Sequence, residues 1–273
     1  MIPRAHITAW RDAAPWATDA QVEQDLVISR ALVELYRDDL LAQELAFRGG
    51  TALQKLHFDP PTRYSEDIDM VQVNPGPIGP VLNAMRTRLD PWLGDPRWKQ
   101  SRGRATFVYR FDSEAKPVTP LKLKVEINTR EHFSVLGLRR ERFSVDSPWF
   151  DGEADLLTFG PEELLGTKVR ALYQRKKGRD LFDLSEALSN LPHLDTQVIV
   201  DCFLRYMEHN GLRVTRSQFE SNLAEKMADD AFLRDVLPLL ASGVTYDPHR
   251  ALELVQHNLI LKLPGDPWKG LER

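Results

Sequence analysis

The stretch FRGGTALQKLHFDPPTRYSEDIDM, residues 47–70, joins a glycine pair to two carboxylates. Gly49 and Gly50 predict a turn ahead of TALQKLH, which has the pattern of a helix start. After a polar segment that contains prolines, DIDMVQV alternates polar and apolar residues and predicts a strand. Side chains two residues apart on a strand share one face, so we expect Asp67 and Asp69 to point the same way.

Two neighbouring carboxylates repel each other unless a positive charge lies between them. Mg²⁺ uses oxygen ligands, commonly one or two carboxylates together with phosphate oxygens of a substrate. Glu126, in the strand pattern LKLKVEIN, is expected to face away from the apolar side and to supply a third carboxylate. Lys122 and Lys124 share its strand face, so pairing of Glu126 with a lysine is the alternative. Glycines ahead of a helix also let the backbone approach phosphates closely.

The rest of the chain predicts an α+β protein. Residues 19–46 have apolar residues at helical spacing and predict one long helix that gives way to a short strand near residues 45–48. A helix is expected over 76–93 and strands over 104–111 and 121–128. We therefore predict a mixed sheet flanked by helices over 1–155. A mostly helical domain over 156–273, broken at Gly178, is expected to complete the active-site cleft.

Composition excludes several classes of protein. The chain has 273 residues, of which 42% are hydrophobic and 28% charged, with a net charge of −4 and a single cysteine. One cysteine cannot form a disulfide within the chain or a multi-cysteine zinc site. The sequence shows no signal-peptide pattern and no apolar run long enough to span a membrane, so we expect a cytoplasmic protein with no membrane partner. A polyanion such as RNA would need a local basic patch.

One such patch lies between Lys168 and Arg179, where six basic residues occur without an acidic one. Two smaller basic clusters lie at 97–104 and 139–142. Phosphates of an RNA are a plausible target of these residues. An ordinary solvated helix face is the alternative. The candidate RNA-binding residues are Arg170, Arg175, Lys176, Lys177 and Arg179.

Three blocks in order carry a resemblance to a known family. They are FRGGTALQKLH, RYSEDIDM and, from Lys168 to Leu184, KVRALYQRKKGRDLFDL. The glycine turn, the Asp-x-Asp strand and a later strand carboxylate resemble the nucleotidyltransferase superfamily of DNA polymerase β type. This resemblance implies a polymerase β-like fold for residues 1–155. The full set is similar to the AbiEii/AbiGii nucleotidyltransferase-like toxins of abortive-infection and toxin–antitoxin systems.

The resemblance implies a Mg²⁺-dependent nucleotidyltransferase that moves NMP from an NTP to an RNA acceptor, the tRNA 3′ end, and an antitoxin partner. Asp67 and Asp69 would bind metal and Glu126 would complete the metal site or act as base. Lys168 would neutralise the leaving pyrophosphate. The nucleotide-binding residues would be Gly49, Gly50, Thr51, Ser65, Lys168, Asp180 and Asp183.

Two alternatives stay open at this point. The acceptor could be a small molecule or a protein hydroxyl, or the chain could be a regulator that binds NTP without catalysis. The intact Asp-x-Asp pair argues against the regulator. The sequence leaves open which NTP is used, the identity of the antitoxin and the oligomeric state.

Overall fold

The computed structural model describes residues 2–114 and 117–270. The chain divides between Phe159 and Gly160 into two compact units, called unit 1 and unit 2 here. Unit 1 ends with the last strand of a sheet, and unit 2 begins with a helix. The boundary expected from the sequence, between residues 155 and 156, falls inside that last strand.

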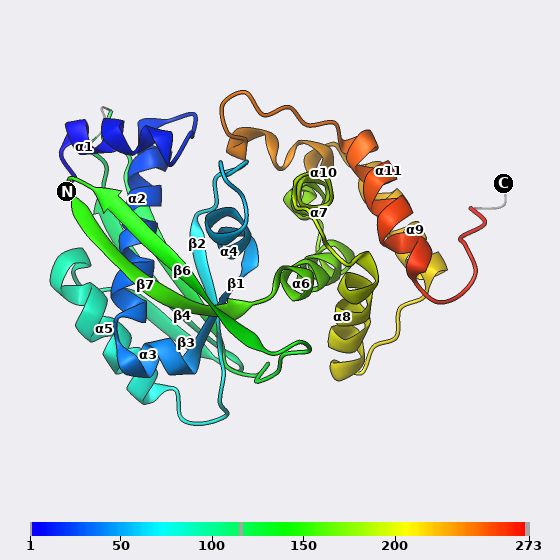
Figure 1. Ribbon diagram of the computed structural model, residues 1–273, viewed down its shortest axis with the longest axis horizontal. Coiled ribbons are helices and arrows are strands. Elements are labelled where there is room, and N and C mark those ends of the chain that lie inside the picture. The colour runs from blue at the N-terminus through cyan, green and yellow to red at the C-terminus, as the bar shows by residue number, and fades with distance from the viewer. Residues whose placement is uncertain (1, 115–116, 271–273) are drawn as a thin grey trace. The chain divides into compact units, whose positions relative to one another are not determined.

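Unit 1 is built on one seven-stranded mixed sheet in the order β3-β4-β5-β2-β1-β7-β6 (Figure 1). β2 pairs in parallel with β5 and β1 with β7, and the other neighbours are antiparallel. The strands are β1 (Leu45–Arg48), β2 (Asp67–Gln72), β3 (Arg97–Ser101), β4 (Arg104–Asp112), β5 (Pro120–Asn128), β6 (Leu138–Ser147) and β7 (Phe150–Phe159).

Helices cover one face of the sheet. Phe107 and Val125 lie on this face and are almost completely buried. α2 packs against β5, β6 and β7, and α5 packs against α2 and β4. This side therefore forms the apolar core of unit 1. The helices of the unit are α1 (Arg4–Ala9), η1 (Trp10–Asp12), α2 (Asp19–Tyr36), α3 (Asp39–Glu44), α4 (Gly49–Leu56) and α5 (Gly79–Leu93).

The prediction of one long helix over residues 19–46 is wrong. The helix ends at Tyr36, and a second one, α3, begins at Asp39. The carboxylate of Asp38 accepts hydrogen bonds from the backbone N–H groups of Leu40 and Leu41, at 3.1 and 3.2 Å. Such a cap starts a new helix and interrupts the old one. The strand predicted next, at 45–48, is present as β1.

Unit 2 is helical in its described part. Gly166 lies where a Cβ atom would come within 2.6 Å of Cβ of Cys202, so α6 and α8 approach closely. The predicted break at Gly178 is confirmed, since α6 ends at Gln174 and α7 begins at Gly178. The helices are α6 (Pro161–Gln174), α7 (Gly178–Asn190), α8 (Thr196–His209), α9 (Arg216–Met227), α10 (Asp230–Arg234), η2 (Leu237–Leu239), α11 (Pro248–Asn258) and η3 (Ile260–Lys262).

No helix within residues 2–114 and 117–270 is long and apolar enough to cross a membrane.

Candidate active site

The two carboxylates of β2 lie on the face of the sheet opposite the core. Ile68 and Met70 are buried at 0% and 1% exposure, whereas Asp67 and Asp69 are partly exposed. This alternation is the one that the sequence predicts for a strand. Asp69 pairs in register with Arg48, the last residue of β1, so the carboxylates lie beside the start of α4.

Gly49 allows the backbone to pass close to Asp69. Its φ is +85°, a conformation that residues with a side chain rarely adopt. A Cβ atom at this position would lie 2.6 Å from Oδ2 of Asp69. The glycine is therefore required twice, by its backbone angle and by the carboxylate next to it. Gly50, the second residue of α4, is buried.

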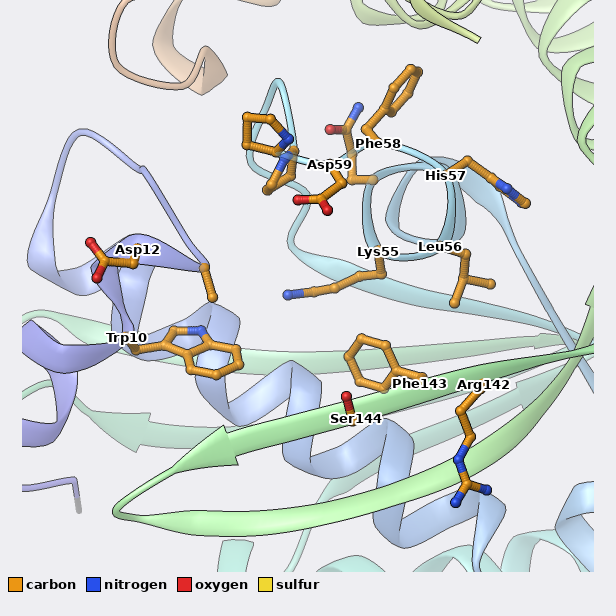
Figure 2. Close-up of a pocket in the computed structure, with 14 residues that line it drawn as sticks. Trp10, Asp12, Lys55, Leu56, His57, Phe58, Asp59, Arg142, Phe143 and Ser144 are labelled. Carbon is orange, nitrogen blue, oxygen red and sulfur yellow. The ribbon is translucent and has the colours of Figure 1, made fainter. Parts of the chain in front are cut away.

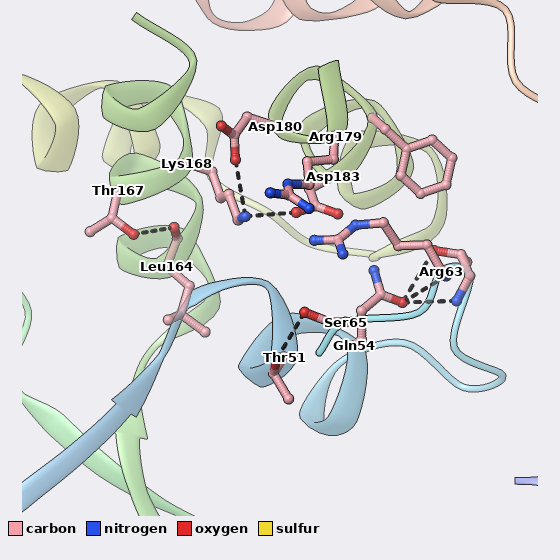
Figure 3. Close-up of polar contacts among 12 residues, drawn as sticks. Thr51, Gln54, Arg63, Ser65, Leu164, Thr167, Lys168, Arg179, Asp180 and Asp183 are labelled. Carbon is pink, nitrogen blue, oxygen red and sulfur yellow. Dashed lines mark hydrogen bonds and ion pairs between the residues drawn. The ribbon is translucent and has the colours of Figure 1, made fainter. Parts of the chain in front are cut away.

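Polar side chains hold the first turn of α4 against the chain that leads into β2. Thr51 donates a hydrogen bond to the carbonyl oxygen of Asp67, and its Oγ1 lies 2.8 Å from Oγ of Ser65 (Figure 3). A Cβ atom on Gly50 would collide with the guanidinium of Arg63. Arg63 is buried at 2% exposure and donates through Nη1 to the carbonyl of Tyr64 at 2.9 Å.

Lys124 lies between two of the carboxylates, and we call Asp67, Lys124 and Glu126 the sheet cluster. The ammonium of Lys124 is 3.1 Å from Oδ2 of Asp67 and forms a closer ion pair with Glu126. Partial burial by itself would lower the pKa of Lys124, but the hydrogen bond to Glu126 and the charge of Asp67 raise it. Glu126 also pairs with Arg104 at 3.2 Å. Pairing of Glu126 with a lysine, the alternative left open by the sequence, is therefore present.

One oxygen of the sheet cluster has no partner. Oδ1 of Asp67 is buried and accepts no hydrogen bond from the residues that the structure describes. A buried carboxylate oxygen without a partner carries a desolvation penalty that a ligand can remove. Within that same part of the chain, no three or more His, Cys, Asp and Glu side chains form a preassembled metal cluster.

Unit 2 contains a second group of acids around a lysine, which we call the helix cluster: Lys168, Arg175, Asp180 and Asp183. Lys168 Nζ lies 3.2 Å from Asp180 and 2.8 Å from Asp183, and both carboxylates are fully buried (Figure 3). Arg175 adds bonds of 2.7 and 2.8 Å to Asp180. Burial alone would raise the pKa of Asp180, but the charge of Lys168 and the hydrogen bonds from Arg175 lower it. The block RDLFDL therefore fixes Lys168 within its own unit.

The basic run of unit 2 meets acids that lie far away in the sequence. Lys176 pairs with Asp229, and Lys177 lies 3.5 Å from Asp235. Arg179 is 3.8 Å from Asp235 as well. The guanidinium of Arg170 lies over the ring of Tyr206, 4.8 Å from its centre. The run has no acid within itself, yet the fold supplies partners for most of its charges.

A cavity of about 520 Å³ lies at the C-terminal end of α4 (Figure 2). Trp10, Lys55, Phe58, Arg142 and Phe143 are among its lining residues. The ammonium of Lys55 is already held by Asp25 at 2.7 Å and Ser29 at 2.9 Å. The lining includes neither the glycine turn nor the carboxylates of β2, so this cavity is separate from the candidate site.

Sequence reasoning missed two residues of this arrangement. Arg63 is not among the predicted site residues, although it stands two residues before Ser65 and four before Asp67 in the extended segment RYSED. That alternation was the signal that could have found it. Lys124 was recognised only as a neighbour of Glu126, and its contact with Asp67 required the parallel register of β2 and β5.

Comparisons with known proteins match the chain to one protein family and to solved structures. A family model described as the nucleotidyl transferase AbiEii toxin of a type IV toxin–antitoxin system matches residues 30–253. Among solved structures, MenT4, a nucleotidyltransferase toxin from Mycobacterium tuberculosis, matches with a TM-score of 0.68 at 16% identity, over 97% of this chain and 92% of that chain. A candidate nucleotidyltransferase from H. pylori matches with a TM-score of 0.51 at 19% identity, over 87% and 92%. No curated protein sequence matches.

The structural likeness confirms the predicted fold class, a nucleotidyltransferase sheet with flanking helices followed by a helical part. The family match is independent of that likeness and covers most of the chain.

Proposed function

Because the chain belongs to the AbiEii family of nucleotidyl transferase toxins of type IV toxin–antitoxin systems, we propose that it transfers NMP from an NTP to the 3′ end of tRNA. The chain is a nucleotidyltransferase, and the family implies an antitoxin partner. The RNA acceptor, the use of Mg²⁺ and a cytoplasmic location are parts of the proposal.

In the proposed reaction, the oxygen of the acceptor hydroxyl forms a bond to the α-phosphorus of the NTP. The bond from that phosphorus to the oxygen bridging to the β-phosphate breaks, and pyrophosphate leaves with the bonding electrons. The hydroxyl proton passes to a base, for which Glu126 is the candidate. In the structure, Glu126 forms ion pairs with Lys124 and Arg104.

The observation that carries the proposal is the buried, unpartnered Oδ1 of Asp67, on the same sheet face as Asp69. Carboxylate oxygens are the ligands that Mg²⁺ prefers, and one or two of them with substrate phosphates are sufficient. Asp67 and Asp69 would therefore hold the metal, and Glu126 would join them. When bound, Mg²⁺ would stabilise charge on the phosphates and lower the pKa of the acceptor hydroxyl.

The glycine turn is proposed to bind the triphosphate. Backbone N–H groups at the start of α4 point away from the helix and attract anions. Thr51 ties this turn to the backbone of Asp67, so the phosphate site and the carboxylates keep a fixed geometry. Ser65, next to Thr51, is the proposed hydroxyl contact to a phosphate. Arg63 adds a buried positive charge beside Gly50.

Two roles remain predictions: neutralisation of the leaving pyrophosphate by Lys168, and nucleotide binding by Asp180 and Asp183. They are supported by the fixed position of the Lys168 ammonium, which two buried carboxylates hold. The proposed RNA contacts of unit 2 remain Arg170, Arg175, Lys176, Lys177 and Arg179.

The test is a transfer assay with the full chain, Mg²⁺, each α-labelled NTP in turn and total bacterial tRNA. We expect label on tRNA with the wild type and none with Asp67→Asn/Asp69→Asn. Asp151→Asn, which removes an exposed strand carboxylate, is the matched control and should keep full activity. Absence of label from tRNA while NTP binding is intact would replace this proposal with another acceptor or with a non-catalytic regulator.

A further inference from the structure

The sheet face that carries Asp67 and Asp69 continues across three more strands to the sheet edge. Residues paired in register on neighbouring strands share a face. The pairing therefore extends from the carboxylates outward to β3, the edge strand (Figure 1). The two rows are Asp69, Glu126, Thr106, Lys99 and Asp67, Lys124, Val108, Arg97.

This face is strongly basic. On the described strands β3, β4 and β5 it carries six basic residues and two acidic ones, Glu126 and Asp112. The other face of β4 and β5 is apolar and buried, as at Phe107 and Val125. The charge is thus confined to one side of the sheet. The basic residues are Arg97, Lys99, Arg104, Arg110, Lys122 and Lys124.

Most of these charges have no acidic partner. Within the described residues, the side chains of Arg97, Lys99, Arg110 and Lys122 form no ion pair or hydrogen bond, and all four residues are exposed. Arg104 is 63% exposed although it reaches Glu126. The basic run of unit 2 differs, because Asp180, Asp229 and Asp235 engage its charges. In a protein with net charge −4, four uncompensated cations on one face require an explanation.

We propose that this basic face, made of the six residues named above, binds the phosphate backbone of the RNA acceptor and directs its 3′ end to Asp67 and Asp69. The proposal deepens the proposed function and depends on it for the identity of the acceptor. Lys99 and Asp69 are three strands apart, about 14 Å at the usual strand spacing. A short run of nucleotides can cover that distance, with phosphates on the cations and the terminal hydroxyl at the carboxylates. Such contacts are independent of base sequence.

Two other functions of an exposed basic strand give different results in the same test. Charged residues on an edge strand prevent pairing with the edge of another molecule. A basic surface also suits an acidic antitoxin. RNA is favoured because the sheet face that carries the cations continues to the carboxylates and does not stop at the edge strand.

The experiment compares Arg97→Gln/Lys99→Gln with Arg205→Gln/Arg213→Gln in the full chain. Both pairs are exposed and remove the same charge, but the second pair lies in unit 2, in and after α8. Binding to fluorescent tRNA is measured by anisotropy at several salt concentrations, and binding of NTP and transfer of label are measured separately. Size-exclusion chromatography reports self-association.

We expect the β3 variant to bind tRNA roughly 10- to 30-fold more weakly at 0.1 M salt. The slope of log K against log salt should fall by about 0.7 for each lost phosphate contact. NTP affinity should be unchanged, and the control should behave as the wild type. This outcome would support RNA binding by the basic face even if no label reaches tRNA. In that case only the proposal that tRNA accepts the NMP group would fail.

Three results would overturn the inference. The first is an unchanged salt slope for the β3 variant while the wild type binds and labels tRNA, which would leave the proposed function intact. The second is normal tRNA binding with new self-association or lost antitoxin binding. The third is a wild type that does not bind tRNA at low salt.

Discussion

The molecule contains two groups in which a lysine stands between acids, and their surroundings differ. In the sheet cluster, Lys124 meets Asp67 and Glu126, whose side chains are 29% and 17% exposed. In the helix cluster, Lys168 meets Asp180 and Asp183, both at 0%. Within the helix cluster, Lys168 and both aspartates are closed to solvent and Arg175 is exposed, whereas the sheet cluster is accessible and leaves one oxygen of Asp67 without a partner among the described residues.

The difference shows that residue types alone do not identify a reactive site. A buried set of ion pairs does not readily replace its lysine with another cation, because removing one member leaves an uncompensated buried charge. A partly exposed set with a vacant lone pair can exchange its lysine for another cation at small cost. We therefore expect substitutions in the helix cluster to affect stability first and substitutions in the sheet cluster to affect ligand binding first.

The largest effect on stability is expected from Asp180→Ala. Loss of this carboxylate leaves Lys168 with one acid and Arg175 without its bonds to Asp180, so the free energy of unfolding should fall by about 3–5 kcal/mol. Chemical denaturation followed by circular dichroism measures this. Asp229→Asn, which removes an acid on the surface of the same unit, is the control and should change stability by less than about 1 kcal/mol. Equal effects of the two variants would contradict the stabilising role of the buried carboxylate of Asp180.

A smaller effect of the same cluster should appear in acid. Lys168 and Arg175 hold the pKa of Asp180 below its ordinary value, so the folded state binds this proton less readily than the unfolded state. The stabilisation is complete above the unfolded pKa of about 3.9 and is lost as the pH falls through the lower folded pKa. Stability measured from pH 6 to pH 2 should therefore fall less steeply in Asp180→Asn than in the wild type. Parallel curves would contradict the assignment.

The sequence predicted the sheet cluster better than the helix cluster for a physical reason. Strand alternation is local, so DIDMVQV and LKLKVEIN were enough to place Asp67, Asp69 and Glu126 on polar faces. In the helix cluster, the spacing of Asp180 and Asp183 suggested that they share a helix face and orient Lys168. The complete burial of the two carboxylates and their bonds to Lys168 and Arg175 depend on packing between helices, which no local pattern reports.

Three strands escaped prediction, and two of them are largely exposed strands at the edges of the sheet. β3 is exposed along its whole length, and β6 is exposed at half of its positions. β3 and β6 are the two edge strands of the sheet, where water reaches both sides and an alternating pattern is not needed. β7 alternates clearly, with Asp151, Glu153 and Asp155 exposed and Leu156 fully buried, so its sequence does contain a strand pattern. The partners of Lys176 and Lys177 were missed since Asp229 and Asp235 are distant in sequence.

The smallest effect should come from Lys124→Met, and it separates the two clusters most clearly. Without Mg²⁺ the variant should lose about 1 kcal/mol or less, since the pairs with Asp67 and Glu126 are partly exposed. Added Mg²⁺ should then raise the melting temperature of the variant more than that of the wild type, because the metal no longer competes with an ammonium for the same carboxylates. Adding Asp67→Asn to the variant should abolish that difference. Lys168→Met provides the contrast, because Mg²⁺ should not restore a closed, buried cluster. Equal responses of wild type and Lys124→Met to Mg²⁺ would mean that Lys124 does not occupy the place of a cation ligand.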